Sequence, residues 1–212
     1  MECADEGMQW KFILPGAPHF GGLWEAAVRS AKTHLLKVLG NSTVSYEDMT
    51  TLLTQVESCL NSRPLNQMSD DPEDLEPLTP SHFLVGSALQ SIPSADYTHT
   101  NYERLNMWEA AQEGLQNFWR RWRTEYLNQL QGRGKWWKPP VEITQGSLVV
   151  IRDDNLPPTR WRIARIIETH LGRDGVVRVV TFRTANGIVN RPLDKICILP
   201  MATEDDELNQ SY

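Results

Sequence analysis

Three charged residues near the start of the chain have the types and the spacing of a chemical site. Glu25, Arg29 and Lys32 occupy positions i, i+4 and i+7, which lie along one face of an α-helix. A carboxylate there is a candidate ligand for a divalent metal ion in a phosphoryl-transfer site, and the two cations are candidate contacts to DNA phosphate. The alternative is a first-turn acid that complements the helix dipole and pairs with Arg29, a contribution of roughly 0.3 kcal/mol.

The surrounding segment predicts a loop followed by an amphipathic helix. Residues 15–22 are rich in proline and glycine, which prevent regular structure and let the backbone approach other groups closely. After this loop, apolar residues recur every three or four positions until Gly40 and Asn41 end the helix. The predicted buried stripe consists of Leu23, Ala27, Ala31, Leu35 and Val38. The three charged residues therefore lie on a different face from the buried one.

Two further helices and a strand are expected in the first part of the chain. Residues 10–14 alternate like a short strand, a helix begins after Ser45, and a short helix begins after Thr79. The first two helices are expected to pack antiparallel on one face of a sheet whose other strands lie outside this sequence. The acidic run SDDPEDLE at 69–76 predicts a solvated loop, because adjacent acids beside a proline have no scaffold that would converge them on a metal ion.

The longest helical pattern runs from about 102 to 130, after a polar linker at 87–102. Its buried stripe is predicted to contain Leu105, Trp108, Leu115, Trp119, Trp122 and Tyr126. Arg120, Arg121 and Arg123 lie among these aromatic residues, so they either contact nucleic acid or form a solvated face. Because a long apolar stripe has to be covered, self-association of this helix is a further expectation.

The last part of the chain predicts a small antiparallel β-structure. Short alternating or β-branched runs are separated by turn sequences between residues 141 and 198, which suggests four or five strands in a barrel of the SH3-like kind. The alternation is expected to place five arginines mostly off the buried face: Arg160, Arg162, Arg165, Arg178 and Arg183. They could follow a phosphate backbone without reading bases, or they could block strand addition at a barrel edge.

The formal net charge of −6 is unevenly distributed. Residues 135–200 hold 11 Lys and Arg against 6 Asp and Glu, whereas residues 1–102 hold 5 against 13. A basic module inside an acidic chain is the electrostatic pattern expected of a protein that touches phosphate. The acidic tail at 201–212 lacks an apolar period and is expected to be disordered.

Cysteine usage and hydropathy indicate an intracellular protein, either nuclear or cytoplasmic. The three cysteines are far apart and form no CxxC pair, which favours reduced, buried thiols over a disulfide framework or a zinc site. No apolar run has the length of a membrane span, and the N-terminus does not read as a signal peptide. No membrane partner and no small-molecule substrate are expected.

Over about nine tenths of its length the chain resembles integrases of Pao/BEL-type LTR retrotransposons, and the agreement of four separate motifs makes the resemblance specific. These motifs are PGAPHFGGLWEAAVRSAKTHL from residue 15, SRPL at 62–65, LTPSHFLVG at 78–86, and the block GSLVVIRDDNLPPTRWRIARI with VRVVTFRTANGIVNRPLDKICILP. The resemblance implies an α+β fold: the C-terminal portion of an RNase H-like α/β core at 1–86, a linker and connecting helix at 87–135, an SH3-like β-barrel at 136–200 and the tail at 201–212.

The resemblance also implies roles for individual residues. Glu25 matches the third acid of the Asp, Asp, Glu set with which such integrases hold two Mg²⁺ or Mn²⁺ ions. The two aspartates would lie upstream of the position of Trp10, and Asp5 and Glu6 match neither of them. We therefore expect a DNA-binding protein associated with DNA integration that is inactive alone and pairs with a second copy or an intact integrase.

Two alternatives remain open from the sequence. In the first, the chain is a domesticated protein- or chromatin-interaction module in which the core remnant is only a scaffold. In the second, a larger enzyme supplies the two missing aspartates. Salt-dependent binding to DNA separates the DNA-binding expectation from the first alternative.

Overall fold

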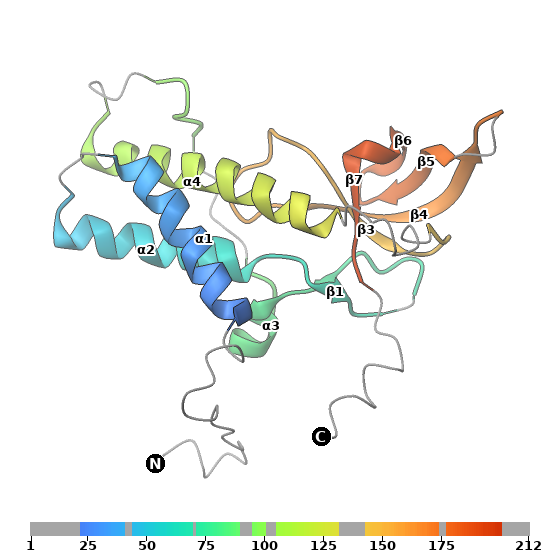
Figure 1. Cartoon of the computed structure of the whole chain (residues 1–212), viewed down its shortest axis with the longest axis horizontal. Coiled ribbons are helices and arrows are strands. Elements are labelled where there is room, and N and C mark those ends of the chain that lie inside the picture. Colours follow the sequence, from blue (N-terminus) through green and yellow to red (C-terminus); the bar gives the residue numbers. More distant parts are fainter. Residues whose placement is uncertain are drawn as a thin grey trace, which may run out of the picture. The chain divides into compact units, whose positions relative to one another are not determined.

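The computed structural model describes residues 22–40, 44–69, 71–89, 95–100, 105–131, 143–173 and 177–200 (Figure 1). The chain divides into two compact units, Met1–Gly40 and Asn41–Tyr212, and each is described by itself. The strand expected at 10–14 and the tail at 201–212 lie outside the described residues. None of the helices in the described ranges combines the length and the apolar character of a membrane span.

The first unit contains one described helix, α1, which spans Gly22–Leu39 and confirms the predicted helix. Glu25 lies in its first turn and Lys37 in its last turn, where each complements the helix dipole. The helix ends at Gly40, whose φ of 52° is in the left-handed region that glycine adopts at little cost. Ala27, which the sequence placed in the buried stripe, is exposed.

Three helices of the second unit begin at side-chain caps. The helix α2 spans Tyr46–Asn61, and its cap Ser45 accepts a hydrogen bond from the backbone of Asp48 at 3.1 Å. The short helix α3 spans Pro80–Val85, and α4 spans Met107–Leu130. The backbone N–H of Asn106 donates to Glu109 Oε2 and the backbone N–H of Glu109 donates to Asn106 Oδ1, both at 2.9 Å, so α4 begins about one turn later than the predicted start near 102.

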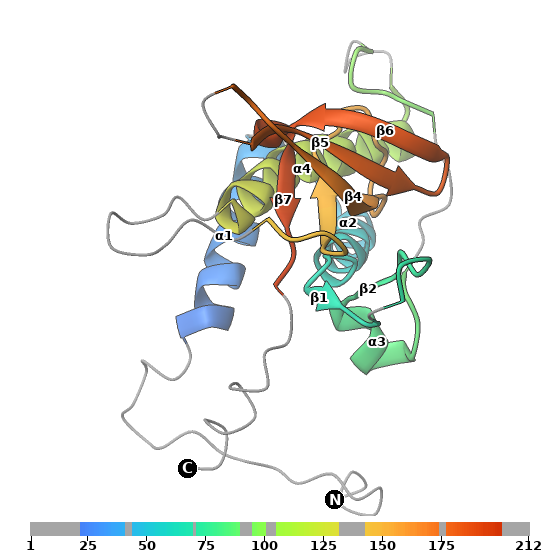
Figure 2. The same cartoon turned by 90° about the vertical axis from the view of Figure 1, so that its right-hand side faces the viewer.

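Five antiparallel strands form the sheet of the second unit (Figure 2). They are β3 (Leu148–Ile151), β4 (Arg162–Leu171), β5 (Val177–Thr184), β6 (Gly187–Pro192) and β7 (Ile196–Ile198), in the spatial order β6-β5-β4-β3-β7. A 3₁₀ turn at Leu193–Lys195 brings β7 back beside β3, with which it pairs antiparallel. The predicted α+β fold, with a long helix followed by C-terminal strands, is confirmed.

Little of the predicted RNase H-like core can be seen within the described part of residues 1–86. It contains α1, α2, α3 and a two-residue ladder between β1 (Asn66–Gln67) and β2 (Pro77–Leu78). This ladder closes the base of the acidic loop at 68–76. The sheet of such a core was expected to lie mostly outside this sequence, so the assignment of the core stays a prediction.

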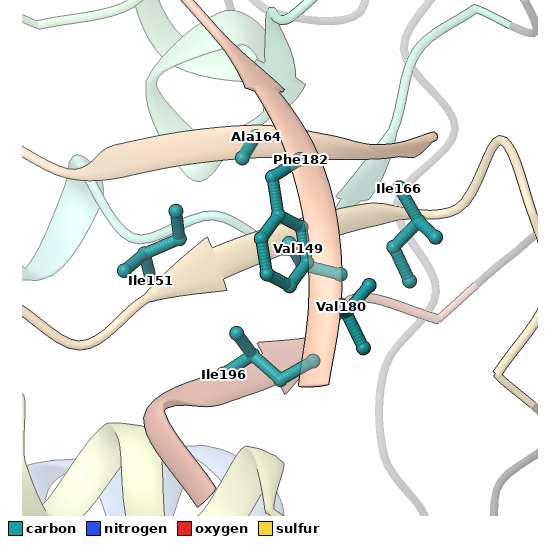
Figure 3. Packing of buried hydrophobic residues seen from close by; sticks show 7 residues of the cluster. All are labelled: Val149, Ile151, Ala164, Ile166, Val180, Phe182 and Ile196. Atoms are coloured by element: carbon teal, nitrogen blue, oxygen red, sulfur yellow. The ribbon is translucent and has the colours of Figure 1, made fainter. Parts of the chain in front are cut away.

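The sheet is covered on both faces at its centre. Its inner face carries one apolar cluster, in which the side chains converge from four strands (Figure 3): Val149, Ile151, Ala164, Ile166, Val180, Phe182 and Ile196. Its outer face carries a second cluster with α4: Leu127, Leu148, Val150, Cys197 and Leu199. All four residues of β3 are therefore buried, although an alternating strand would normally expose one side.

The segment after α2 belongs to the same compact unit as the sheet. In that unit α2 packs against α4, and the two helices lie side by side (Figure 1). The indole Nε1 of Trp161 donates a hydrogen bond to Ser62 Oγ at 3.2 Å, and the Tyr126 hydroxyl donates to the Pro64 carbonyl. These contacts lie within the compact unit Asn41–Tyr212, and the domain boundary expected at residue 86 stays a prediction.

The buried thiols of the second unit give its stability a dependence on alkaline pH. Burial raises the pKa of Cys59 from 9.0 to about 12, offset in part by a backbone hydrogen bond from Thr159, and raises that of Cys197 from 9.0 to about 11. Because the pKa of each thiol is higher in the folded than in the unfolded state, the contribution of the thiols to stability is fully present below the unfolded pKa of 9.0. Above this pH only the unfolded thiols lose protons, so that stability is lost as the pH rises toward the folded values.

We expect the free energy of unfolding at pH 9.5 to be roughly 1–2 kcal/mol below its value at pH 7.5. Urea unfolding at several pH values measures this difference. The double variant Cys59→Ala/Cys197→Ala, although less stable throughout, should show a flatter pH dependence between these values. An unchanged slope in that variant would assign the alkaline loss to other groups.

Candidate nucleic-acid interface

The three charged residues singled out on α1 lie together on one exposed face. Glu25, Arg29 and Lys32 line a shallow depression on this helix with Val28, Thr33 and Leu36. The Thr33 hydroxyl donates to the Arg29 carbonyl at 2.8 Å, so it is satisfied by the helix backbone. The structure thus brings the acid and the two cations together as the spacing predicted.

The described residues do not fit a two-metal centre. Two-ion catalysis requires several ligands that hold the ions about 3.5–4 Å apart. Within the described ranges, no three His, Cys, Asp or Glu side chains are close enough to hold a metal ion. In the acidic loop, Asp71 Oδ1 accepts from the Glu73 backbone at 2.9 Å and Asp74 Oδ1 from the Glu76 backbone at 2.8 Å, so these carboxylates cap their own loop.

Arg165 corrects the expectation that the arginines of the sheet lie off the buried face. It is only 4% exposed. Its guanidinium donates to the carbonyls of Asp74 at 2.7 Å, Ser69 at 3.1 Å and Gly146 at 2.8 Å. The alternation did direct Arg165 away from the inner cluster. However, the acidic loop covers the outer face at this position, so the prediction of exposure was wrong.

The other four arginines do not form a continuous free row. Arg162 pairs with Asp153 at 2.8 Å, and Arg183 pairs with Glu73 of the acidic loop. Arg160 and Arg178 are exposed, one before β4 and one in β5. Arg162, Arg165 and Arg183 are thus engaged by acids or carbonyls of the same unit.

A cleft of about 800 Å³ gathers a second set of cations beside α4. Its walls are α4, the segment at 96–99, the loop between β3 and β4, and the turn before β7. Arg120, Arg123, Arg152 and Lys195 line it, together with the acids Asp96 and Asp154. The sequence had singled out the arginines of α4 but not the two other cations. Those are brought together because the Arg152 backbone donates to the Lys195 carbonyl at 2.8 Å as β3 pairs with β7.

Arg123 forms the buried base of this cleft. Its guanidinium lies 5.7 Å from the centre of the Trp119 ring and 3.4 Å from both the Leu156 carbonyl and Asp154 Oδ1. Burial lowers its pKa, Asp154 and Asp153 oppose that shift, and the charges of Arg120 and Arg152 lower it further. The guanidiniums of Arg120, Arg123 and Arg152 therefore repel one another across the cleft, an arrangement that favours an anion.

The segment at 96–99, which forms one wall of the cleft, is fixed to α4 by one glutamine. Gln116 donates through Nε2 to the Ala95 carbonyl at 2.7 Å and accepts from the Tyr97 backbone at 2.9 Å. Hydrogen bonds from the Thr98 side chain and backbone lower the pKa of Asp96, and the nearby charges of His99 and Arg120 contribute. The segment thus presents an ionised acid near Arg120 without neutralising the cluster.

Comparison with known proteins adds one finding. Residues 106–199 match the model of a family described as "Family of unknown function (DUF5641)". The match begins at the cap of α4 and ends after β7, so it covers the helix and all five strands that form the cleft and the sheet. No curated protein matches the chain.

Proposed function

We propose that this chain is a protein derived from a Pao/BEL-type integrase that binds DNA through phosphate contacts, in the nucleus or in cytoplasmic integration intermediates. Its process is DNA integration, and it is inactive as a polynucleotidyl transferase by itself. The observation that carries the proposal is the concentration of cations in one segment of the chain: residues 135–200 hold 11 Lys and Arg against 6 Asp and Glu, in a chain whose net charge is −6. Such a basic segment attracts a polyanion although the whole chain is negatively charged.

The proposed lack of catalytic activity of the chain by itself rests on the site on α1. Glu25 is the one acid of the family set present in this sequence, and Mg²⁺ or Mn²⁺ would need the two aspartates from a second copy or an intact integrase. Arg29 and Lys32 remain available on the same exposed face for DNA phosphate. Binding to DNA through these two cations therefore does not depend on the missing aspartates.

Salt-dependent binding tests the proposal. Fluorescence anisotropy with a random-sequence duplex measures the binding constant at several salt concentrations. The slope of its logarithm against the logarithm of the salt concentration should become shallower by about 0.9 for each lost phosphate contact. We expect Arg160→Gln/Arg178→Gln, which removes two exposed cations, to change the slope by about 2. The control Arg162→Gln removes the same kind of charge from an ion pair with Asp153 and should change it less.

A slope near zero would contradict DNA binding and favour the interaction module. One observation supports that second candidate: Phe83, Leu84 and Val85 of α3 are exposed in succession. Exposed apolar residues in such a group are typical of protein-protein contacts. In that case DNA affinity would be unchanged by both arginine variants.

A further inference from the structure

We propose that the cleft beside α4 is a phosphate-binding site in which Arg120, Arg152 and Lys195 bind the oxygens of a phosphate dianion or of two successive backbone phosphates. The proposal rests on the proposed function only in taking nucleic acid as the source of these phosphates. It places the contacts to phosphate in a defined cleft and not on the surface of the sheet.

The charge of the lining matches this ligand. Four Arg and Lys side chains face two Asp side chains, which leaves a net charge of +2 when His99 is neutral. The acid Asp153, which could have balanced it, is committed to Arg162 at 2.8 Å. A dianion neutralises the cleft, whereas a single carboxylate leaves half of the excess charge.

The geometry separates ligands from a positioning residue. Arg123 is 2% exposed and already donates to the Leu156 carbonyl, so it fixes the loop between β3 and β4 and does not itself reach outward. Arg120 is exposed, and the Arg152 guanidinium is anchored at one nitrogen by Asn128. The remaining nitrogens of Arg152 can present the forked donor pair that suits phosphate oxygens.

The shape suits a nucleotide unit better than a free ion alone. The volume of about 800 Å³ has room for a sugar beside the phosphate, and Leu156, Pro157 and Pro158 form an apolar part of the lining. Pro157 and Pro158 have no backbone N–H with which to read a base edge. Binding is therefore expected to be independent of sequence, as contacts to phosphate and sugar are.

The first test compares neighbouring arginines of α4 in the full chain. Arg120→Gln, Arg152→Gln and Lys195→Gln are each expected to weaken binding to a random-sequence duplex about tenfold at low salt. Arg121→Gln is the matched control, because Arg121 is equally exposed on α4 but is not among the residues that line the cleft. We expect its affinity to stay within about twofold of the parent. Thermal melting verifies that each variant is folded.

A charge-reversed test makes the opposite prediction. Asp154→Asn raises the net charge of the cleft by one and should tighten DNA binding about threefold at low salt. Glu57→Gln makes the same change in charge on the exposed side of α2 and should have a smaller effect. Equal effects of the two variants would overturn the cleft as the site, because only the total charge would then matter.

Separate titrations with inorganic phosphate and with a mononucleotide distinguish the sources of the ligand. The Trp119 indole N–H, which donates to Leu156 at 3.2 Å in the cleft wall, is the NMR reporter. Phosphate shifts that depend on Arg120, without DNA binding, would support the cleft and contradict the proposed function. DNA binding that responds to Arg160→Gln/Arg178→Gln but not to the cleft variants would support the function and overturn the cleft.

Discussion

Trp119→Ala should lower the free energy of unfolding by about 3–5 kcal/mol. Trp119 is 2% exposed and connects α4 to the sheet unit. Its ring meets that of Trp161 edge-on at 4.9 Å and that of Trp122 at 6.0 Å, and its indole donates to the Leu156 carbonyl. Alanine removes the aromatic contacts, leaves a cavity and takes away one hydrogen bond.

Trp108→Ala is the matched control on the same helix. Trp108 is 58% exposed, so its loss should change stability by less than about 1 kcal/mol. Denaturant unfolding gives both values. An unchanged dependence of the unfolding free energy on denaturant concentration would show that the unfolding transition is the same in both variants. Trp119→Phe should lie between them because it keeps a ring but not the indole donor. Equal effects of the two alanine variants would mean that α4 does not depend on Trp119 to hold the sheet.

The elements could be predicted because their signals are local. The helix α2 follows from Ser45 with Asp48 and from apolar spacing, and β3 to β6 follow from short alternating runs between turn sequences. The start of α4 was misplaced because the pair Asn106 and Glu109, which caps it, was not used. Such a cap is visible in the sequence and could have corrected the boundary.

Contacts distant in sequence decided what the alternation could not. Periodicity indicated which side of β4 Arg165 occupies, but not that a loop 91 residues away covers that side. Likewise, Trp108 belongs to the periodic stripe of α4 and is nevertheless 58% exposed. A pattern specifies a face, and only the packed structure specifies what lies on it.

The cleft was missed for the same reason. Arg120 was singled out for its aromatic neighbours, whereas Arg152 follows β3 and Lys195 precedes β7. Those two residues become neighbours when the strands pair, with Ile151 opposite Ile196. The return of β7 to the side of β3 is a property of the whole sheet. The spacing of residues within β3 or within β7 does not predict that these two strands pair.

Arg165→Ala should lower the free energy of unfolding by about 2–4 kcal/mol. The buried guanidinium is stabilised by hydrogen bonds to three carbonyls, and the bonds to Ser69 and Asp74 also hold the acidic loop against the outer face of the sheet. Removing the side chain leaves those acceptors without the cation. The loop is then still held by its own caps, by the packing of Leu75 against the outer cluster and by the ion pair between Glu73 and Arg183.

Two comparisons isolate the cause. Arg160→Ala removes an exposed arginine just before the same strand and should change stability by less than about 0.5 kcal/mol. Arg165→Lys keeps the charge but lacks the planar fork, so it cannot reach all three carbonyls and should lose part of the stability. Hydrogen exchange should quicken in the loop at 71–76 more than in β5, because the anchor of the loop is lost while the inner cluster of the sheet remains intact. Uniform protection across both regions in Arg165→Ala would show that the loop is held by something other than this arginine.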